Sequence, residues 1–190
     1  MIKACLALDI TERKRLEADL QRQAITDELT GVYNRRHFFQ LASDELKRAT
    51  RLHHTLTIAL IDLDHFKEIN DTHGHLIGDQ ALLALMHVCR KTLREIDVLA
   101  RFGGDEFILL FPETIHQHAY ECVERIRQAL VPMNLSGTRV SITISAGLAG
   151  LDSGEDTLEL LLARADQALY QAKAAGRNCS RIAPTHETVH

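Results

Sequence analysis

The chain has few cysteines, no long hydrophobic run and no excess of positive charge, and each of these absences excludes a class of protein. Its cysteines are widely spread and form no Cys-x-x-Cys pair: Cys5, Cys89, Cys122 and Cys179. That spacing argues against a zinc cluster or a disulfide scaffold and fits a reducing compartment, so we expect a cytoplasmic location. No apolar run approaches the roughly 18–20 residues of a membrane span. We therefore expect no membrane contact by this fragment, although a full-length parent could be membrane-associated.

The formal net charge of −4 gives no electrostatic case for nucleic acid as a partner. A negative chain can still bind a nucleotide if it recruits a metal ion and places a few cations locally. The first nine residues are too short and too soon acidic for a secretory signal. The length of 190 residues suits one domain plus an appendage.

The N-terminal segment predicts a linker rather than a part of a core. Residues 2–8 are short and apolar, like the end of a strand, and Asp9 and Glu12 have the spacing of a capping box. A polar helix should follow to about residue 24. One narrow apolar stripe at spacing four suits a coiled-coil linker, and a frayed solvent helix is the alternative. The stripe consists of Leu16, Leu20 and Ala24.

The remaining patterns predict an α+β fold. Helices are expected over 34–51, 76–93, 115–131 and 155–175, a helical turn and loop over 66–75, and strands over 54–64 and 139–148, with a hairpin over 97–111. Without the first helix this order is the β-α-β-β-α-β order of ferredoxin-like folds. The palm domains of polymerases and the class III nucleotidyl cyclases share that core. We expect a central, mostly antiparallel sheet flanked by helices.

The most informative stretch is Arg101-Phe-Gly-Gly-Asp-Glu-Phe107, where two glycines run into two carboxylates. Apolar residues before and after it predict a hairpin with Asp105 and Glu106 at its tip. Glycine permits a positive φ and lets a ligand approach the main chain. Carboxylates at such a turn are the hard oxygen ligands that magnesium prefers, and magnesium commonly brings a phosphate with it.

A second pair of carboxylates, Asp62 and Asp64, ends the apolar strand over 54–64. Residues two apart lie on the same side of a strand. If this strand neighbours the hairpin, Asp62 meets Asp105 and Glu106, and the like charges repel unless a cation joins them. In the alternative, Asp64 caps the following turn and only Asp62 points into the site. We therefore favour Asp62 as the metal ligand.

The loop over 66–79 is dense in hydrogen-bonding groups and glycines, which fits recognition better than packing. A carboxylate can accept both donors of a guanine edge, and an amide can donate and accept, so Asn70 and Asp79 are candidates for reading guanine. The alternative is that Asp79 caps the helix after Gly78. His73 and His75 alternate like a metal pair but lack a patterned third ligand, so surface histidines are favoured; His75 could still touch a phosphate.

The end of the last helix carries two cations, Lys173 and Arg177, four residues apart. Gly176 lies between them and is expected to terminate the helix. Cations at a helix C-terminus can simply complement the helix dipole. If this helix end faces the hairpin, they become anchors for a triphosphate.

Taken together, these segments resemble a GGDEF domain of the diguanylate cyclase family over residues 27–182, with 183–190 as a tail. Four ordered motifs carry the resemblance, at the spacing of the family. They are Asp27-Glu-Leu-Thr-Gly31 with Asn34-Arg-Arg36, Asp62-Leu-Asp-His-Phe-Lys67 with Asn70-Asp71, Gly74-His75 and Gly78-Asp79, Gly103-Gly-Asp-Glu-Phe107, and Leu169-Tyr-Gln-Ala-Lys173 with Gly176-Arg-Asn178.

The resemblance implies an enzyme that condenses two GTP molecules into cyclic di-GMP and releases two pyrophosphates. Two domains face each other as a homodimer, and each 3′-hydroxyl attacks the α-phosphorus of the other GTP. The implied metal is Mg²⁺, with Mn²⁺ as an alternative, held by Asp62, the Leu63 carbonyl and Asp105. Glu106 is a further ligand or the base. The implied GTP contacts are Asn70 and Asp79 to guanine, Lys173 and Arg177 to the β- and γ-phosphates, and Phe66, Lys67, His75, Gly103 and Gly104 nearby.

A second feature of the family is the RxxD pattern of Arg94 and Asp97, which ends five residues before the motif glycines. In the family this is an inhibitory site for the product, and Arg125 is a candidate third member. The alternative for the pattern itself is an i to i+3 ion pair.

The N-terminal Asp9-Ile-Thr-Glu-Arg-Lys14 resembles the exit from a PAS sensor domain. We expect residues 1–26 to be the end of a missing PAS-like domain and its signalling-helix linker. His73 departs from the aromatic residue common in the family, so that loop can pack differently. The competing functions are a catalytically silent module that binds GTP or cyclic di-GMP, and another nucleotidyl cyclase on the same core.

Overall fold

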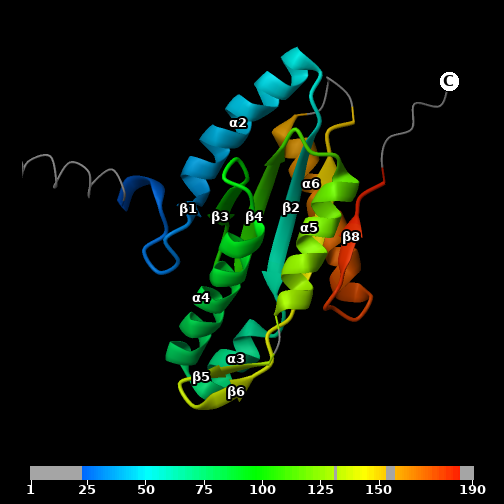
Figure 1. Ribbon diagram of the computed structural model, residues 1–190. Helices are drawn as coiled ribbons and strands as arrows, with labels where there is room; N and C mark the ends of the chain where they lie inside the picture. Colours follow the sequence, from blue (N-terminus) through cyan, green and yellow to red (C-terminus); the bar gives the residue numbers. More distant parts are fainter. Residues whose placement is uncertain (1–22, 131, 153–156, 185–190) are drawn as a thin grey trace, which may run out of the picture.

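A six-stranded sheet forms the centre of the computed structural model, which describes residues 23–130, 132–152 and 157–184 (Figure 1). Its strands are β1 (Tyr33–Asn34), β2 (Leu56–Leu63), β3 (Val98–Arg101), β4 (Glu106–Pro112), β7 (Ile144–Gly150) and β8 (Ser180–Ile182). They lie in the order β1-β3-β4-β2-β7-β8. The four inner strands are antiparallel, and β1 and β8 pair in parallel with β3 and β7 at the two edges.

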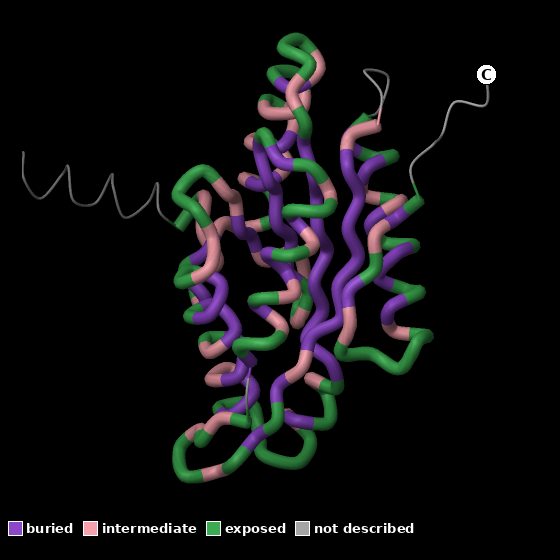
Figure 2. The backbone as a smooth tube through the Cα atoms, turned by 45° about the vertical axis from the view of Figure 1, so that its right-hand side comes forward, coloured by how far each residue is buried: buried purple, intermediate pink, exposed green. Residues whose placement is uncertain are grey.

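Helices cover both faces of the sheet. They are α2 (Arg35–Leu52), α3 (Phe66–His73), α4 (His75–Thr92), α5 (His116–Ala129) and α6 (Leu158–Ala174). Buried residues of α4 and α5 form one core with one face of the sheet, and those of α2 and α6 form a second core with the other face. Figure 2 shows the buried inner strands between these two layers. The order β2-α4-β3-β4-α5-β7 is the expected β-α-β-β-α-β order, so the predicted fold class is confirmed.

Strand β2 runs through the middle of both cores, and all eight of its residues are buried. Ala59 and Ile61 face one core, while Ile58 and Leu60 face the other. A strand covered on both faces must be apolar throughout, which explains the near-continuous apolar run. Apart from Thr57, whose hydroxyl donates to the Thr114 carbonyl, the polar residues appear where β2 leaves the core, at the end of the sheet next to α3 (Figure 1).

The position of α6 against β7 depends on Gly147. A Cβ atom there would lie 2.1 Å from the Ala165 carbonyl oxygen and 2.1 Å from the Leu169 nitrogen. Both contacts are to backbone, so no side-chain rearrangement could relieve them. The helix can approach the strand this closely only because residue 147 has no side chain.

Several boundaries differ from the sequence prediction. The strand expected over 139–148 is two elements, because β6 (Thr138–Val140) pairs with β5 (Met133–Leu135) in a separate hairpin and β7 begins only at Ile144. Helix α5 ends at Ala129, two residues before the expected end, and α6 begins at Leu158 behind the cap Thr157, three residues after the expected start. The short edge strands β1 and β8 were not predicted, because two or three residues carry no usable periodicity.

The helix expected before residue 24 falls largely on residues 1–22, outside the described part of the chain. Within the described residues, no helix is long and apolar enough to cross a membrane.

Candidate active site

The tip of the β3–β4 hairpin forms as expected, and its two glycines have an ordinary backbone. The Glu106 carbonyl accepts hydrogen bonds from the amides of Phe102 (2.8 Å) and Gly103 (3.2 Å). Neither Gly103 nor Gly104 has a positive φ, which corrects that part of the prediction. A Cβ atom at Gly103 would lie 3.0 Å from Oε2 of Glu106, and one at Gly104 would enter open space. The tip therefore leaves its main chain open to a ligand.

Arg101 links this tip to the turn that precedes β1. Its guanidinium donates to the Gly104 carbonyl (2.7 and 3.0 Å) and forms an ion pair with Asp27 (3.1 Å). Asp27 also accepts from the amide (2.9 Å) and hydroxyl (2.6 Å) of Thr30. Sequence reasoning gave Asp27 no role of its own, although an Asp followed three residues later by Thr has the spacing of such a turn.

Asp62 lies at the centre of the candidate site. It is opposite Glu106 in the β2–β4 register and opposite Ser145 in the β2–β7 register. Its Oδ2 is 2.7 Å from Nζ of Lys173, so the end of α6 does face the carboxylates. Burial raises the pKa of Asp62 above its ordinary value of 3.8, the contact with Lys173 opposes this rise, and the charge of Asp105 adds to it.

Asp105 is joined to the same strand end through its backbone, because the Leu63 amide donates to the Asp105 carbonyl at 3.2 Å. Asp62, Leu63, Asp105, Glu106 and Lys173 therefore meet at one end of the sheet. The sequence pattern had predicted this meeting on the condition that β2 and the hairpin were neighbours, and they are.

Asp64 has a different set of partners from Asp62. It is 3% exposed and accepts hydrogen bonds from the hydroxyls of Thr143 (2.9 Å) and Ser145 (2.7 Å) and from the Asn178 amide (3.0 Å). The idea that Asp64 caps the following turn is wrong, since α3 begins after His65 without a side-chain cap. Donors of the protein therefore occupy both oxygens of Asp64, and Asp62 stays the predicted metal ligand.

The candidate guanine-reading residues lie on two helices in contact. Asn70 is on α3, and Asp79 is the fifth residue of α4, which begins after Gly74; Asp79 is therefore not a helix cap. A Cβ atom at Gly78 would lie 1.9 Å from Oδ1 of Asn70 and 3.3 Å from Cε2 of Phe66. Gly78, the residue before Asp79, thus leaves the space that the Asn70 amide occupies.

The neighbouring candidates differ in exposure. Phe66 is half-buried and packs against the core under α4. Lys67 and His75 are exposed. His73 and His75 flank Gly74 between α3 and α4, and both are exposed, as expected for surface histidines.

Helix α6 ends as the sequence predicted. Gly176, with a φ of 108°, donates its amide to the Lys173 carbonyl, and the Arg177 amide donates to the Ala172 carbonyl at 3.2 Å. These two bonds are the pair that closes a helix behind a left-handed residue. Arg177 itself is exposed.

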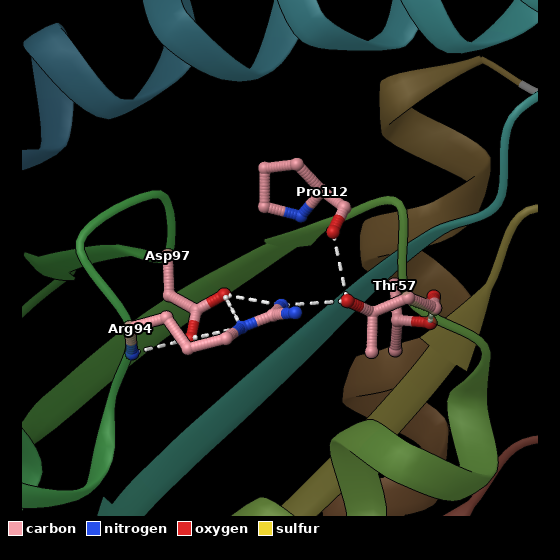
Figure 3. Close-up of polar contacts among 5 residues, drawn as sticks. Thr57, Arg94, Asp97 and Pro112 are labelled. Atoms are coloured by element: carbon pink, nitrogen blue, oxygen red, sulfur yellow. Dashed lines mark hydrogen bonds and ion pairs between the residues drawn. The ribbon is translucent and has the colours of Figure 1, made fainter.

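Arg94, Asp97 and Arg125 line one cavity of about 640 Å³ between the β3 approach and α5. Within it the alternative expected for the RxxD pattern is realised as an ion pair, with Nη2 of Arg94 2.7 Å from Oδ1 of Asp97 (Figure 3). The Asp97 side chain is only 1% exposed, whereas that of Arg94 is 52% exposed. The hydrogen bond to Asp97 raises the pKa of Arg94 further.

Thr114 completes the wall of this cavity, and sequence reasoning missed it. Its hydroxyl accepts from Arg94 (2.7 Å) and donates to the Pro112 carbonyl (2.7 Å). Its own carbonyl accepts from the Thr57 hydroxyl (2.8 Å) at the start of β2. Figure 3 shows the Arg94 guanidinium with Asp97 on one side and Pro112 and Thr57 on the other. No local pattern in the sequence marks a threonine 20 residues from its arginine.

Among the described residues, no three His, Cys, Asp or Glu side chains converge closely enough to hold a metal ion by themselves. Asp62 has Lys173 as its nearest cation instead. A metal ion at this end of the sheet would need oxygen ligands besides these side chains, such as main-chain carbonyls or substrate phosphates.

Comparisons with known proteins agree with this geometry. The family model described as "Diguanylate cyclase, GGDEF domain" matches residues 24–179. Diguanylate cyclase DgcP of Pseudomonas aeruginosa is 42% identical over 167 residues, which cover 87% of this chain and 25% of that protein. Diguanylate cyclase DgcM of Escherichia coli is 38% identical over 174 residues, covering 92% of this chain and 42% of that protein. The chain thus spans less than half the length of these curated relatives.

Solved structures give the same answer. The coiled coil and GGDEF domain of DgcB from Caulobacter crescentus, solved in complex with c-di-GMP, superimposes with a TM-score of 0.85 at 32% identity, over 96% of this chain and 99% of that one. The active GGEEF domain of a diguanylate cyclase from Vibrio cholerae gives a TM-score of 0.76 at 34% identity, over 80% of this chain and 97% of that one. The cluster around Asp62, the hairpin tip and these matches together establish that the chain belongs to the GGDEF domain family of diguanylate cyclases.

Proposed function

We propose that this chain condenses two molecules of GTP into cyclic di-GMP with release of two pyrophosphates. One observation carries the proposal: Asp62, Asp105, Glu106 and Lys173 meet at the end of the sheet where the open hairpin tip lies. A carboxylate with a raised pKa, such as Asp62, beside a cation and an open main chain is typical of sites that handle phosphates. The relatives named as diguanylate cyclases support the same reaction.

The donor set at this end fits a divalent cation, and Mg²⁺ is the proposed ion. Asp62, Asp105 and Glu106 offer carboxylate oxygens, and Leu63 offers a carbonyl, all of them hard ligands. Mg²⁺ usually takes one or two carboxylates together with substrate phosphates rather than a complete protein cage, which fits the absence of a convergent triad among the described residues. When bound, the ion would neutralise charge on the triphosphate and polarise the α-phosphorus.

The protein's own residues would position the substrate. Lys173 and Arg177 lie at the end of α6 and would hold the β- and γ-phosphates as charge-assisted donors. Asn70 and Asp79 would read the guanine edge from α3 and α4. Phe66 and Lys67 lie in the first turn of α3, and His75 is the first residue of α4. Glu106 lies opposite Asp62 and would act as a further ligand or accept the proton of the attacking 3′-hydroxyl.

A single domain carries one GTP, so the product requires two copies of the chain facing each other. We propose a homodimer as the active form. Proximity and charge stabilisation would supply most of the acceleration, as in phosphoryl transfer generally.

The cavity around Arg94 supports a second proposal, that cyclic di-GMP binds there as an inhibitor. Arg94 and Arg125 would grip phosphate, and Asp97 would accept from guanine once its ion pair with Arg94 opens. Because this cavity is separate from the Asp62 cluster, it also favours one alternative function, a silent module that senses cyclic di-GMP.

The PAS-like origin of residues 1–26 also stays a prediction.

The deciding experiment incubates the dimer, confirmed by its mass in solution, with Mg²⁺ and GTP and identifies the products by mass spectrometry. We expect cyclic di-GMP and pyrophosphate in a ratio of one to two. A cyclic mononucleotide would indicate another nucleotidyl cyclase. Cyclic di-GMP binding without any turnover would instead establish the silent module, and Asp62→Asn is the inactive control.

A further inference from the structure

The turn that carries Arg177 has a backbone that must be held in place from outside. Arg177 has a φ of 62° and Asn178 a φ of 46°, directly after Gly176 at 108°. Consecutive left-handed residues other than glycine are unfavourable and persist only where the surrounding structure determines them. Gly176 accounts for the end of α6, but it does not account for the two residues that follow.

One hold on this turn comes from the end of β2. The Asn178 amide donates to Oδ2 of Asp64 at 3.0 Å. The other oxygen of Asp64 accepts from Ser145 on β7 at 2.7 Å, and the carboxylate is 3% exposed. The buried Asp64 carboxylate, at the end of β2, therefore connects the turn to β2 and β7 through hydrogen bonds.

The second hold comes from α5. Nη1 of Arg127 donates to Oδ1 of Asn178 at 3.0 Å. Arg127 is fixed in turn by Glu124, with three contacts of 2.7 to 3.0 Å, and Glu124 also accepts the Ser180 hydroxyl at 2.7 Å. Asn178 is thus held through its amide by the sheet and through its side chain by a helix.

This clamp lies beside the candidate site. Lys173, one turn before Arg177, pairs with Asp62, and Asp62 is two residues before Asp64. The exposed Arg177 side chain therefore starts from a backbone fixed relative to both carboxylates. Fixing the origin of a long side chain reduces the entropy it loses when it binds an anion.

We propose that Asp64 and Arg127 are positioning residues, which clamp Asn178 and so fix Arg177 against the triphosphate of GTP. The inference rests on the proposed function, since it takes Arg177 as a phosphate anchor. Neither Asp64 nor Arg127 needs to touch the nucleotide. Their contribution is to substrate binding, through the conformation of residues 176–178.

The test uses Asn178→Gly, which removes the contact with Arg127 but keeps the amide and suits the left-handed backbone. Arg127→Gln and Asp64→Asn complete the series, and Arg181→Gln, an exposed cation on β8, is the matched control. We expect KM for GTP to rise about tenfold in each clamp variant with a smaller change in kcat. The control should keep the wild-type KM.

Binding of 3′-deoxy-GTP, which lacks the attacking hydroxyl, provides a readout without turnover. Calorimetry should give an affinity about tenfold lower for Asn178→Gly. In an Arg177→Ala background, Asn178→Gly should lower the affinity by less than about a further twofold, because the side chain that the clamp positions is already absent. Wild-type affinity in Asn178→Gly and Arg127→Gln, or full additivity with Arg177→Ala, would overturn the inference.

These outcomes separate the inference from the function on which it rests. A wild-type protein that binds 3′-deoxy-GTP but makes no cyclic di-GMP would refute the cyclase proposal, while the affinities of the variants still decide the clamp. A wild-type protein that does not bind the analogue would refute both. Should Asp64→Asn fail to fold, Asn178→Gly decides the question, since Asn178 is exposed, and Arg127→Gln supports it, since the Arg127 side chain is 21% exposed and not fully buried.

Discussion

At the residue scale, the Arg94–Asp97 pair has a clear consequence for inhibition. The ion pair holds Asp97 at 1% exposure and leaves Arg94 half in solvent. Arg94→Ala should leave the chemistry intact and raise the cyclic di-GMP concentration needed for half-inhibition at least about tenfold, because a charge-assisted contact is lost. Initial rates against added product measure this, with exposed Arg51→Ala as the control. Equally strong inhibition in Arg94→Ala would refute the inhibitory-site proposal.

Asp27 provides a residue-scale prediction about pH. Burial alone would raise its pKa, but hydrogen bonds from Thr30 and the charge of Arg101 outweigh burial and lower the pKa below its ordinary value of 3.8. Because the pKa is lower in the folded state, ionised Asp27 stabilises the fold at pH values above its ordinary pKa. This stability is lost as the pH falls through the folded-state pKa. Asp27→Asn should therefore flatten the acid limb of the stability profile.

Urea unfolding between pH 6 and pH 3 measures this slope. Asp44→Asn is the control, because the Asp44 side chain is 80% exposed and should leave the profile unchanged. An unaltered acid limb in Asp27→Asn would mean that the contact between the turn and Arg101 contributes nothing to folding.

At the element scale, the contact between β7 and α6 decides where Lys173 lies. Gly147→Ala places a Cβ atom 2.1 Å from two backbone atoms of α6, so the helix must move away from the sheet. We expect the free energy of unfolding to fall by about 1–3 kcal/mol or more, together with weaker GTP binding. Denaturant melts of Gly147→Ala check the first effect.

Gly150→Ala is the matched control in the same strand. Its Cβ atom would lie 3.3 Å from Nδ1 of His116, a side chain that can shift. Its loss of stability should be clearly smaller. Equal losses in the two variants would show that the closeness of α6 to Gly147 is not what limits the packing.

At the scale of the whole molecule, the proposed reaction needs two chains, since each GTP must be attacked by the other. Activity per chain should therefore rise with protein concentration and level off once the dimer is formed. Product assays alongside light scattering over the same concentrations measure both quantities. Constant activity per chain across a transition from monomer to dimer would contradict the proposed arrangement.

Much of the fold was predictable because its elements are long and periodic. Helices α2 and α4 and strand β2 were each located within two residues, since their apolar patterns extend over several turns or over both faces of a strand. The β5–β6 hairpin and the edge strand β8 were missed because three-residue strands have no period. The glycines of the tip were expected to permit a positive φ, yet neither adopts one, and a Cβ atom would approach another group closely only at Gly103.

The candidate site was predictable to a different extent. The sequence by itself determined the chemistry at each position: carboxylates where β2 leaves the core, an open turn before Asp105, cations where α6 ends. Those features are local, because they depend on strand alternation, turn residues and helix termination. Only the tertiary structure decided which of these groups meet. The pairing of β2 with β4 brought Asp62 opposite Glu106, and the close approach at Gly147 brought Lys173 to Asp62.

The same distinction applies to Asp62 and Asp64, two residues apart in one motif. Sequence alternation places them on the same side of a strand, and it offers no way to tell a ligand from a buried junction. Donors from Thr143, Ser145 and Asn178, about 80 to 114 positions away, surround Asp64 and leave Asp62 facing Lys173. Contacts over such separations depend on the packing of whole elements, and for that reason only the folded chain could assign the two carboxylates their different places.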